Sequence, residues 1–278
     1  MKKDIIKAYA KINLSLSIFG KNKNNFHKIQ SVISFLDLHD IIRINHTNKK
    51  NHTVKFFGPF SNNLKKNTIS KLLNILDKKK LLKKKYNIQI TKNIPQRSGL
   101  GGGSMDAASL LSYFFKKKLL ITRKEVLNIS NQIGSDVFIG LERKNSILVS
   151  NKIMKRYKAR MGLFTVLIKP NIGCSTGEIY REVRSYSSRK IKISEHIFKI
   201  EKLKKMQNDL ELPAFKRYPI LRKLKIFLSK IDHVKFVRMT GSGSTIVAYF
   251  SNKKSALNAL KLIKRNFKNY WSILSKTI

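Results

Sequence analysis

Residues 98–111 read SGLGGGSMDAASLL, a stretch in which four glycines fall within five consecutive positions before an apolar helical pattern begins. Glycine lacks a Cβ atom, so residues 99 and 101–103 can adopt positive φ and turn successive backbone N–H groups toward one anion. A helix expected from about Ser104 adds unpaired N–H groups and a partial positive charge at its first turn. The stretch therefore predicts a phosphate site between a strand and a helix.

The same stretch matches neither of the two common nucleotide-binding fingerprints. No Lys-Ser or Lys-Thr pair follows Gly103, as a P-loop requires. No acidic residue lies about 20 positions further on at the end of a second strand, as a dinucleotide-binding fold would have. A flexible turn without a ligand is the alternative interpretation of the stretch taken alone.

Two charged residues, Lys11 and Asp136, suggest what the phosphate site does. From Ile6 to Ile18 the even positions are apolar and the odd ones polar, which predicts a strand with one buried face and places Lys11 and Asn13 on its polar face. Asp136 follows a helix in the short turn GSDVF. Phosphoryl transfer to a hydroxyl needs a phosphate cradle, charge neutralisation and a group that orients or deprotonates the acceptor. Lys11 and Asp136 are candidates for the last two tasks; a solvated strand lysine and a capping loop aspartate are the alternatives.

The rest of the chain combines short apolar strands with amphipathic helices. Thr122, with Glu125 three residues later, predicts a capping box for a helix that ends at Gly134. Further strands are expected at 29–44, 52–58, 86–94 and 162–170 and on both sides of a turn at 241–243, and further helices at 64–82, 178–185, 194–206, 218–230 and 253–266. The polar, basic residues 150–160 are expected to be a linker. Because strands and helices mix without strict alternation, the sequence predicts an α+β fold.

Composition limits the class of protein without deciding it. The 278 residues suffice for one large or two medium domains, and 59 basic against 15 acidic residues give a formal net charge of +44. Such a charge predicts anionic partners, whether nucleic acid, a membrane surface or phosphorylated ligands. A compositional bias toward Lys, Asn and Ile on a tolerant surface is the alternative explanation. No 18 consecutive residues are apolar, so no transmembrane helix is expected.

Cysteine and histidine usage indicates a reducing compartment and no structural metal. Cys174 is the only cysteine, so no internal disulfide is expected and a cytoplasmic location is favoured. The six histidines show no close pairing on a helix face and have no cysteine partners, so no zinc site is expected. A metal ion, if one is used, would arrive with the substrate.

Six segments resemble, in order and spacing, those of the GHMP kinases. They are AYAKINLSLSIFGKNKNNFHKIQSVISFLDLHD (8–40), PQRSGLGGGSMDAASLL (95–111), IGSDVF (133–138), PNIGCSTGEIY (170–180), NDLE (208–211) and RMTGSGSTIVAYF (238–250). The resemblance covers the whole chain, and its glycine-rich segment alone identifies only the superfamily. The opening AxAKINLxL pattern, the Phe26-His27 pair and NDLE narrow it to members that act on a diphosphocytidyl sugar alcohol.

The resemblance implies an α+β, two-domain GHMP kinase fold. Residues 1–155 would form an ATP-binding N-terminal domain of the ribosomal protein S5 domain 2-like type, and residues 156–278 a ferredoxin-like C-terminal domain. The implied reaction is the ATP-dependent phosphorylation of the C2 hydroxyl of 4-diphosphocytidyl-2-C-methyl-D-erythritol in non-mevalonate isoprenoid precursor biosynthesis, with Mg²⁺ accompanying ATP. The implied protein is cytoplasmic, a monomer or homodimer, without a specific nucleic-acid or membrane partner.

Individual residues receive roles from the same resemblance. Asp136 matches the general base that takes the proton from the C2 hydroxyl, and Lys11 matches the lysine that pairs with this aspartate and steadies the developing charge. Phe26 and Tyr180 match aromatic residues on the two faces of cytosine, and His27 matches a residue that hydrogen-bonds the edge of that base. The residues that would hold the ATP phosphates are Pro95, Gln96, Arg97, Ser98, Gly99, Leu100, Gly101, Gly102, Gly103 and Ser104. Weaker matches that would contact the acceptor substrate are Asn13, Thr176, Gly241 and Gly243.

The chain departs from the family pattern in and near the phosphate loop. Gln96, Arg97 and Ser98 stand where small residues and another glycine are usual, Met105 replaces a usual serine, and Phe138 replaces a usual proline. Arg97 is therefore a further candidate for contact with phosphate, and Ser104 takes any role that a serine has with phosphate or Mg²⁺.

Two other classes of protein remain alternatives. A kinase of the same superfamily for homoserine, mevalonate or a sugar would lack the Phe26, His27 and Tyr180 arrangement for cytosine. A basic nucleic-acid-binding protein would explain the charge, but it would explain neither the glycine stretch nor Asp136.

Overall fold

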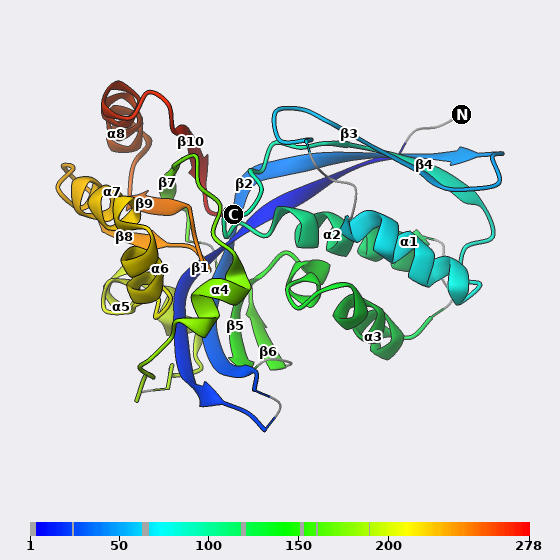
Figure 1. Cartoon of the computed structure of the whole chain (residues 1–278), viewed down its shortest axis with the longest axis horizontal. Coiled ribbons are helices and arrows are strands. Elements are labelled where there is room, and N and C mark those ends of the chain that lie inside the picture. Colours follow the sequence, from blue (N-terminus) through cyan, green and yellow to red (C-terminus); the bar gives the residue numbers. More distant parts are fainter. Residues whose placement is uncertain are drawn as a thin grey trace. The chain divides into compact units, whose positions relative to one another are not determined.

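The computed structural model describes residues 4–23, 25–62, 67–117, 121–150, 153–159, 161–188 and 190–278. The chain divides into two compact units that interleave along the sequence (Figure 1). The first unit comprises Met1–Lys11, Leu38–Gln96 and Gly101–Arg143. The second unit comprises Ile12–Asp37, Arg97–Leu100 and Lys144–Ile278.

Two long strands, β1 (Asp4–Lys21) and β2 (His27–Thr47), account for this interleaving. Each strand contributes one part to each unit, so the compact units do not follow a single cut of the chain near residue 155. Compact units and family domains are different divisions of a chain, and the boundary at residue 155 stays a prediction.

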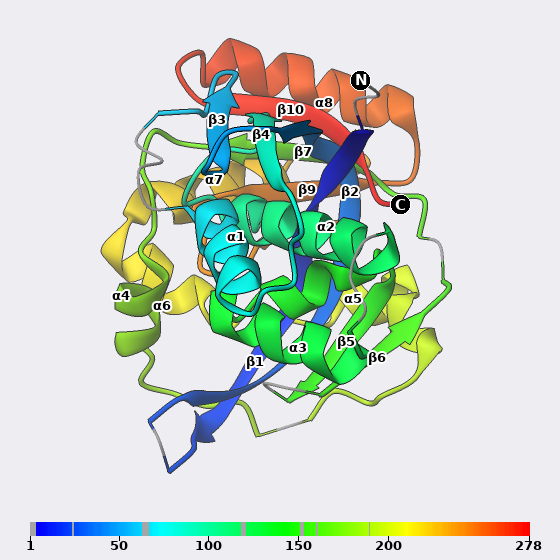
Figure 2. The same ribbon diagram turned by 90° about the vertical axis from the view of Figure 1, so that its right-hand side faces the viewer.

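In the first unit, helices pack against one face of a sheet (Figure 2). Residues 41–47 of β2 pair antiparallel with β4 (Lys85–Thr91), and β4 pairs in parallel with β3 (Thr53–Phe57). The helices are α1 (Thr68–Lys78), α2 (Gly102–Lys117) and α3 (Arg123–Ile133), followed by the 3-10 helix η1 (Val137–Leu141). Their apolar faces bury Leu72, Leu76, Leu111 and Phe114 together with the strand residues Ile42, Ile44, Ile88 and Ile90. This core holds the start of α2, where the glycine stretch ends.

In the second unit, four strands form an antiparallel sheet in the order β10-β7-β9-β8. They are β7 (Phe164–Lys169), β8 (Phe236–Met239), β9 (Ile246–Phe250) and β10 (Trp271–Lys276). Helical segments connect β7 to β8, and α8 (Lys253–Asn266) connects β9 to β10. This β-α-β-β-α-β order is the ferredoxin-like arrangement that the resemblance implies.

The connection from β7 to β8 is made of short helices. They are α4 (Thr176–Arg181), the 3-10 helix η2 (Glu195–Phe198), α5 (Ile200–Lys204), α6 (Glu211–Arg217) and α7 (Pro219–Ser229). The predicted helix at 194–206 is therefore split into η2 and α5, and α6 was not predicted. The second unit also contains β5 (Asn145–Ser150) and β6 (Ile153–Tyr157), with β5 paired to residues 31–33 of β2.

The expected linker at 150–160 is wrong for residues 153–157, which form β6 and pair antiparallel with β5. Residues 151, 152 and 160 lie outside the described residues. β6 lies at the end of its sheet order and carries basic side chains. Charged residues are common on edge strands because they discourage pairing with another chain, so the segment reads as a linker although it is a strand.

The predicted one-sided burial of β1 is also wrong in its middle. Residues 10–16 are buried at both even and odd positions, so Lys11, Asn13 and Ser15 are buried as well as their apolar neighbours. Lys11 is covered by the glycine stretch of the first unit, and Asn13 bonds with Ser31 in the second unit. Both contacts are with residues distant in the sequence, and the alternation of apolar and polar residues along the strand cannot predict such contacts.

In the portion of the chain that the structure describes, no helix is both long and apolar enough to span a membrane.

Candidate active site

The glycine stretch approaches other backbone and side-chain atoms so closely that side chains would not fit. Gly99 has φ +76°, and a Cβ atom there would lie 2.0 Å from the carbonyl oxygen of Thr240. Gly101 has φ +72°, and a Cβ atom there would lie 3.0 Å from Cγ of Lys11. Helix α2 begins at Gly102, two residues before the predicted start, so the N–H groups of its first turn come from the stretch itself. The close approach of Thr240 and Lys11 therefore explains why glycine stands at residues 99 and 101, and the start of α2 beside them is where a helix stabilises an anion.

Lys11 and Asp136 meet in the first unit. The Nζ atom of Lys11, on β1, lies 3.5 Å from Oδ2 of Asp136, which follows α3 and directly precedes η1. The lysine side chain is 6% exposed and the aspartate side chain 41% exposed. A buried ammonium group therefore lies beside a carboxylate that remains accessible from outside. The predicted capping box of Thr122 and Glu125 and the end of α3 before Gly134 are confirmed, and they fix the turn that carries Asp136.

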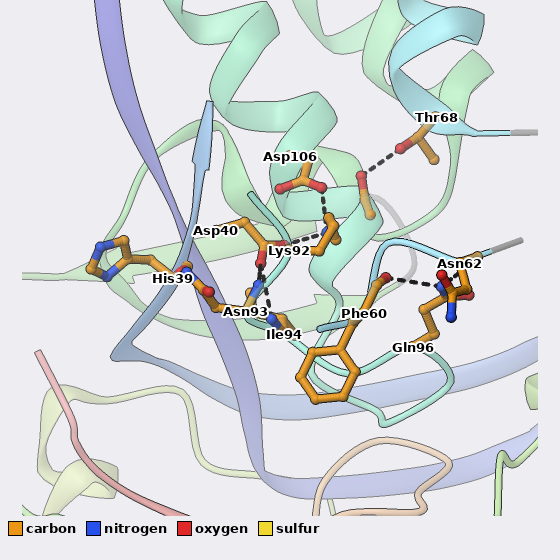
Figure 3. A network of polar contacts seen from close by, with 11 residues as sticks. His39, Asp40, Phe60, Asn62, Thr68, Lys92, Asn93, Ile94, Gln96 and Asp106 are labelled. Carbon is orange, nitrogen blue, oxygen red and sulfur yellow. Dashed lines mark hydrogen bonds and ion pairs between the residues drawn. The ribbon is translucent and has the colours of Figure 1, made fainter. Parts of the chain in front are cut away.

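A second ion-paired cluster joins the two ends of the glycine stretch, and the sequence did not indicate it (Figure 3). Lys92, after β4, donates to Asp106 in α2 at 2.6 Å and also to Asp40 in β2. Asp40 accepts in addition from the backbone N–H groups of Asn93 and Ile94, at 2.6 and 2.9 Å. All three charged side chains are buried. The cluster fixes the chain on both sides of the loop.

Burial sets the protonation of this cluster. Desolvation, with a contribution from Asp40, raises the pKa of Asp106 to about 8 against the opposing effect of Lys92. Burial alone would lower the pKa of Lys92, but the charges and hydrogen bonds of Asp106 and Asp40 raise it. Burial therefore disfavours the ionised form of Asp106, while the two carboxylates favour the charged form of Lys92.

The departures from the family pattern have structural roles. The Gln96 side-chain amide donates to the carbonyl oxygens of Phe60 and Asn62, at 3.1 and 2.6 Å, and so ties the loop before α1 to the glycine stretch (Figure 3). The Thr68 hydroxyl at the start of α1 donates to the carbonyl oxygen of Gly103 at 2.6 Å. Met105 is buried and packs against Gly140. A Cβ atom added at Gly140 would lie only 2.8 Å from the Sδ atom of Met105. Met105 therefore fills a core position in place of a hydroxyl.

In the second unit, two residues predicted to bind cytosine lie together. The rings of His27 and Tyr180 are 5.1 Å apart at 40°. Phe26 is 68% exposed, an unusual state for a large aromatic side chain. Desolvation and the charge of Lys21 lower the pKa of His27, which favours its neutral form. A neutral imidazole has one donor and one acceptor, as recognition of a base edge requires.

The weaker candidates for acceptor contacts are held by neighbouring polar groups of the second unit. Asn13 donates from its side chain to the Ser31 hydroxyl at 2.8 Å, and its backbone N–H donates to the Thr240 hydroxyl at 3.0 Å. The Thr176 and Ser242 hydroxyls are 3.0 Å apart. Ser242 lies between Gly241 and Gly243, both with positive φ, in the turn that follows β8.

Comparisons with known proteins find relatives over the whole length of the chain. Residues 66–142 match the GHMP kinases N terminal domain, and residues 199–269 match the GHMP kinases C terminal domain. The 4-diphosphocytidyl-2-C-methyl-D-erythritol kinase of Pelagibacter ubique is 49% identical over 277 residues, 98% of each chain, and that of Clostridium perfringens is 30% identical over 282 residues, again 98% of each.

Solved structures share the fold. A 4-(cytidine 5'-diphospho)-2C-methyl-D-erythritol kinase superposes with a TM-score of 0.80 at 23% identity, covering 98% of this chain and 99% of that one. The homoserine kinase of Cytophaga hutchinsonii has a TM-score of 0.66 at 15% identity, covering 100% and 95%. The chain therefore belongs to the GHMP kinases and, within them, to the family of the 4-diphosphocytidyl-2-C-methyl-D-erythritol kinases.

Proposed function

We propose that this chain transfers the γ-phosphoryl group of ATP to the C2 hydroxyl of 4-diphosphocytidyl-2-C-methyl-D-erythritol, in isoprenoid precursor biosynthesis by the non-mevalonate route. The bond from the γ-phosphorus to the bridging oxygen of ATP breaks, a bond from phosphorus to the C2 oxygen forms, and ADP leaves. The observation that carries the proposal is the contact of Lys11 with Asp136 in the unit whose α2 begins in the glycine stretch. The full-length relatives support the choice of acceptor.

The donor side of the reaction is assigned to residues 95–104. Backbone N–H groups of the stretch and of the first turn of α2 would bind the phosphates of ATP, because an anion is stabilised at a helix N-terminus. In the described part of the chain, no three His, Cys, Asp or Glu residues cluster as metal ligands. An Mg²⁺ ion would arrive with the nucleotide and neutralise phosphate charge, and the Ser104 hydroxyl would be its ligand from this loop.

The acceptor hydroxyl is activated by Asp136. Its exposed carboxylate would accept the C2 hydroxyl proton as the new bond to phosphorus forms. The buried Lys11 ammonium group would orient that carboxylate and stabilise negative charge that develops during transfer. The two side chains therefore have distinct tasks, proton acceptance for the aspartate and charge stabilisation for the lysine.

The cytidine end of the acceptor is assigned to the second unit. Phe26 and Tyr180 would stack on cytosine, and neutral His27 would bond its edge. Asn13, Thr176 and the backbone of Gly241 and Gly243 would contact the rest of the substrate. A kinase for homoserine or mevalonate has no base to bind, so this set of residues favours the diphosphocytidyl acceptor.

A cytoplasmic location is part of the proposal, and Cys174 supports it. It is the single cysteine of the chain and forms no disulfide, as is usual in a reducing compartment.

Acceptor competition tests the proposed function. The purified chain is incubated with ATP, Mg²⁺ and one acceptor at a time, and ADP release is measured with 4-diphosphocytidyl-2-C-methyl-D-erythritol, homoserine and mevalonate. The proposal predicts rapid turnover with the first acceptor and only background release with the others. Equal or faster turnover of homoserine or mevalonate would refute the assignment of the acceptor.

A further inference from the structure

We propose that Asp209, in the NDLE segment, is a positioning residue for the cytidine end of the acceptor site. The inference rests on the proposed function, because it concerns the residues assigned above to cytosine. The Asp209 carboxylate holds together the two chain segments that bring His27 and Tyr180 to each other. Asp209 is not assigned any contact with substrate.

The hydrogen bonds of Asp209 join β1 to the segment after α4. Its Oδ2 atom accepts from the backbone N–H of Ile18 and from the hydroxyl of Ser187, both at 2.7 Å. The backbone N–H of Ser187 in turn donates to the carbonyl oxygen of Ile18 at 2.7 Å. The three residues form a closed set in which each is bonded to the other two. All of them belong to the second unit.

The backbone of the NDLE segment is fixed to the same strand. The Asp209 N–H donates to the carbonyl oxygen of Leu16 at 2.8 Å, and the Leu16 N–H donates to the carbonyl oxygen of Gln207 at 3.0 Å. Leu16 and Asn208 accordingly form a parallel bridge. The carboxylate is therefore held at a defined position on β1, which is what a positioning group requires.

The segments joined in this way carry the two rings. β1 ends at Lys21 and leads into the turn before His27, the first residue of β2. Tyr180 lies in α4, and Ser187 follows this short helix in the chain. Because His27 and Tyr180 come from segments with no regular pairing between them, their 5.1 Å ring separation depends on how those segments are tied. The Asp209 carboxylate supplies two of the bonds that tie them, next to the backbone bond from Ser187 to Ile18 and the bond from the Ile191 N–H to the Gln30 side chain.

Other members of NDLE hold a different part of the second unit. The side-chain amide of Asn208 donates to the carbonyl oxygens of Met239 and Gly241, both at 2.8 Å. Glu211 accepts from the N–H of Met239 at 2.8 Å. The turn that they hold contacts the glycine stretch, since the Thr240 hydroxyl donates to the carbonyl oxygen of Gly99 at 3.2 Å. Changes at Asn208 would therefore reach the ATP loop, whereas Asp209 bonds with Ile18, Ser187 and Leu16, which lie outside that loop.

The test separates acceptor binding from ATP binding. Asp209→Ala removes both carboxylate hydrogen bonds, and Asp209→Asn keeps a carbonyl oxygen that can accept them. Asn252→Ala is the matched control, because it removes a side chain that accepts from the Ser255 N–H at 2.8 Å at the start of α8 in the same unit. KM values for the acceptor and for ATP are measured, and calorimetry gives the Kd of cytidine 5'-diphosphate and of a non-hydrolysable ATP analogue.

We expect Asp209→Ala to raise the acceptor KM and the Kd of cytidine 5'-diphosphate by about tenfold or more, since hydrogen bonds to a charged group are strong. The KM for ATP should stay within about twofold, Asp209→Asn should restore most of the acceptor affinity, and Asn252→Ala should change neither constant. If Asp209→Ala does not fold, Ser187→Ala removes one of the two donors and should show the same selective effect at smaller size.

The inference is overturned if Asp209→Ala or Ser187→Ala leaves both affinities unchanged, weakens both in parallel, or weakens ATP binding alone. It is also overturned if Asp209→Asn is as defective as Asp209→Ala. Absence of turnover by the unmodified protein would instead refute the proposed function. In that case the Kd of cytidine 5'-diphosphate still decides whether Asp209 positions a cytidine site.

Discussion

The stem of the Lys11 side chain occupies the space beside Gly101. A Cβ atom on Gly101 would lie 3.0 Å from Cγ and 3.1 Å from Cε of Lys11. The Nζ atom of the same lysine lies 3.5 Å from Asp136. The absence of a side chain at residue 101 thus lets the loop approach β1 without displacing the ammonium group from the aspartate.

We expect Gly101→Ala to lower kcat as well as stability. The added methyl group would push Lys11 away from Asp136, and alanine at φ +72° costs roughly 1–2 kcal/mol of backbone strain. Gly162→Ala is the matched control, because Gly162 has φ +62° with nothing within 4 Å of its Cβ position. Steady-state kinetics and thermal unfolding should show similar destabilisation for both variants but a kcat loss for Gly101→Ala only. Equal kcat values in the two variants would show that the contact with Lys11 is dispensable.

The raised pKa of Asp106 predicts a pH-dependent stability. Between about pH 4 and pH 8 the folded protein keeps the proton that the unfolded chain releases, so this residue lowers stability as pH rises. Asp106→Asn removes that dependence. The unfolding free energy of the unmodified protein should therefore fall relative to the variant from about pH 5 to pH 8, by at most about 1.4 kcal/mol per pH unit.

Urea denaturation of both proteins across this range measures the difference. Asp77→Asn is the control. Burial opposes the shift, but hydrogen bonds from Lys85 and His52 lower the pKa of Asp77, so its contribution to stability is lost only as pH falls below this range. The difference between the unmodified protein and Asp77→Asn should therefore stay constant from about pH 5 to pH 8. A difference between the unmodified protein and Asp106→Asn that stays constant with pH would contradict a raised pKa of Asp106 in the folded protein.

Tyr180 is predicted to act through its ring. Tyr180→Ala should raise the acceptor KM by about tenfold, since stacking of a base on an aromatic ring is worth about 1–3 kcal/mol. Tyr180→Phe keeps the ring and should behave almost as the unmodified protein does. Initial rates at varied acceptor concentration decide between them, and a phenylalanine variant as impaired as the alanine variant would point to the hydroxyl instead.

Arg97 is predicted to contribute to ATP binding. Arg97 is exposed and has φ +48°. Its stem packs against Gly173, where an added Cβ atom would lie 3.0 Å from both Cβ and Cδ of the arginine. We expect Arg97→Ala to raise the KM for ATP by roughly fivefold, because charge-assisted hydrogen bonds to phosphate are strong. An unchanged KM for ATP would exclude Arg97 from the phosphate site.

Local patterns in the sequence predicted an element correctly where the residues that determine it are neighbours in the chain. The capping box of Thr122 and Glu125, the helix at 253–266 and the strand pair around Gly241 are confirmed, because each depends on side chains a few residues apart. The contact of Lys11 with Asp136 followed from the family resemblance and not from periodicity, which placed Lys11 on an exposed face.

Features that depend on distant partners were missed. Asp40, Lys92 and Asp106 come from three elements, and nothing local to any of them shows that they meet in a buried cluster. The sequence offered one signal for this buried cluster, namely charged residues that stand next to apolar strand and helix patterns. β6 was missed because its basic composition, suited to an edge strand, is also that of a solvated linker.

The central claim, that Asp136 accepts the proton of the acceptor hydroxyl beside Lys11, is tested most directly by one measurement. ADP release from ATP, Mg²⁺ and 4-diphosphocytidyl-2-C-methyl-D-erythritol is compared for the unmodified protein and Asp136→Asn, whose folding is checked by thermal unfolding. Loss of a general base predicts a kcat about 10²–10⁴-fold lower with little change in the KM for ATP. A folded Asp136→Asn variant that releases ADP at the unmodified rate would contradict the mechanism.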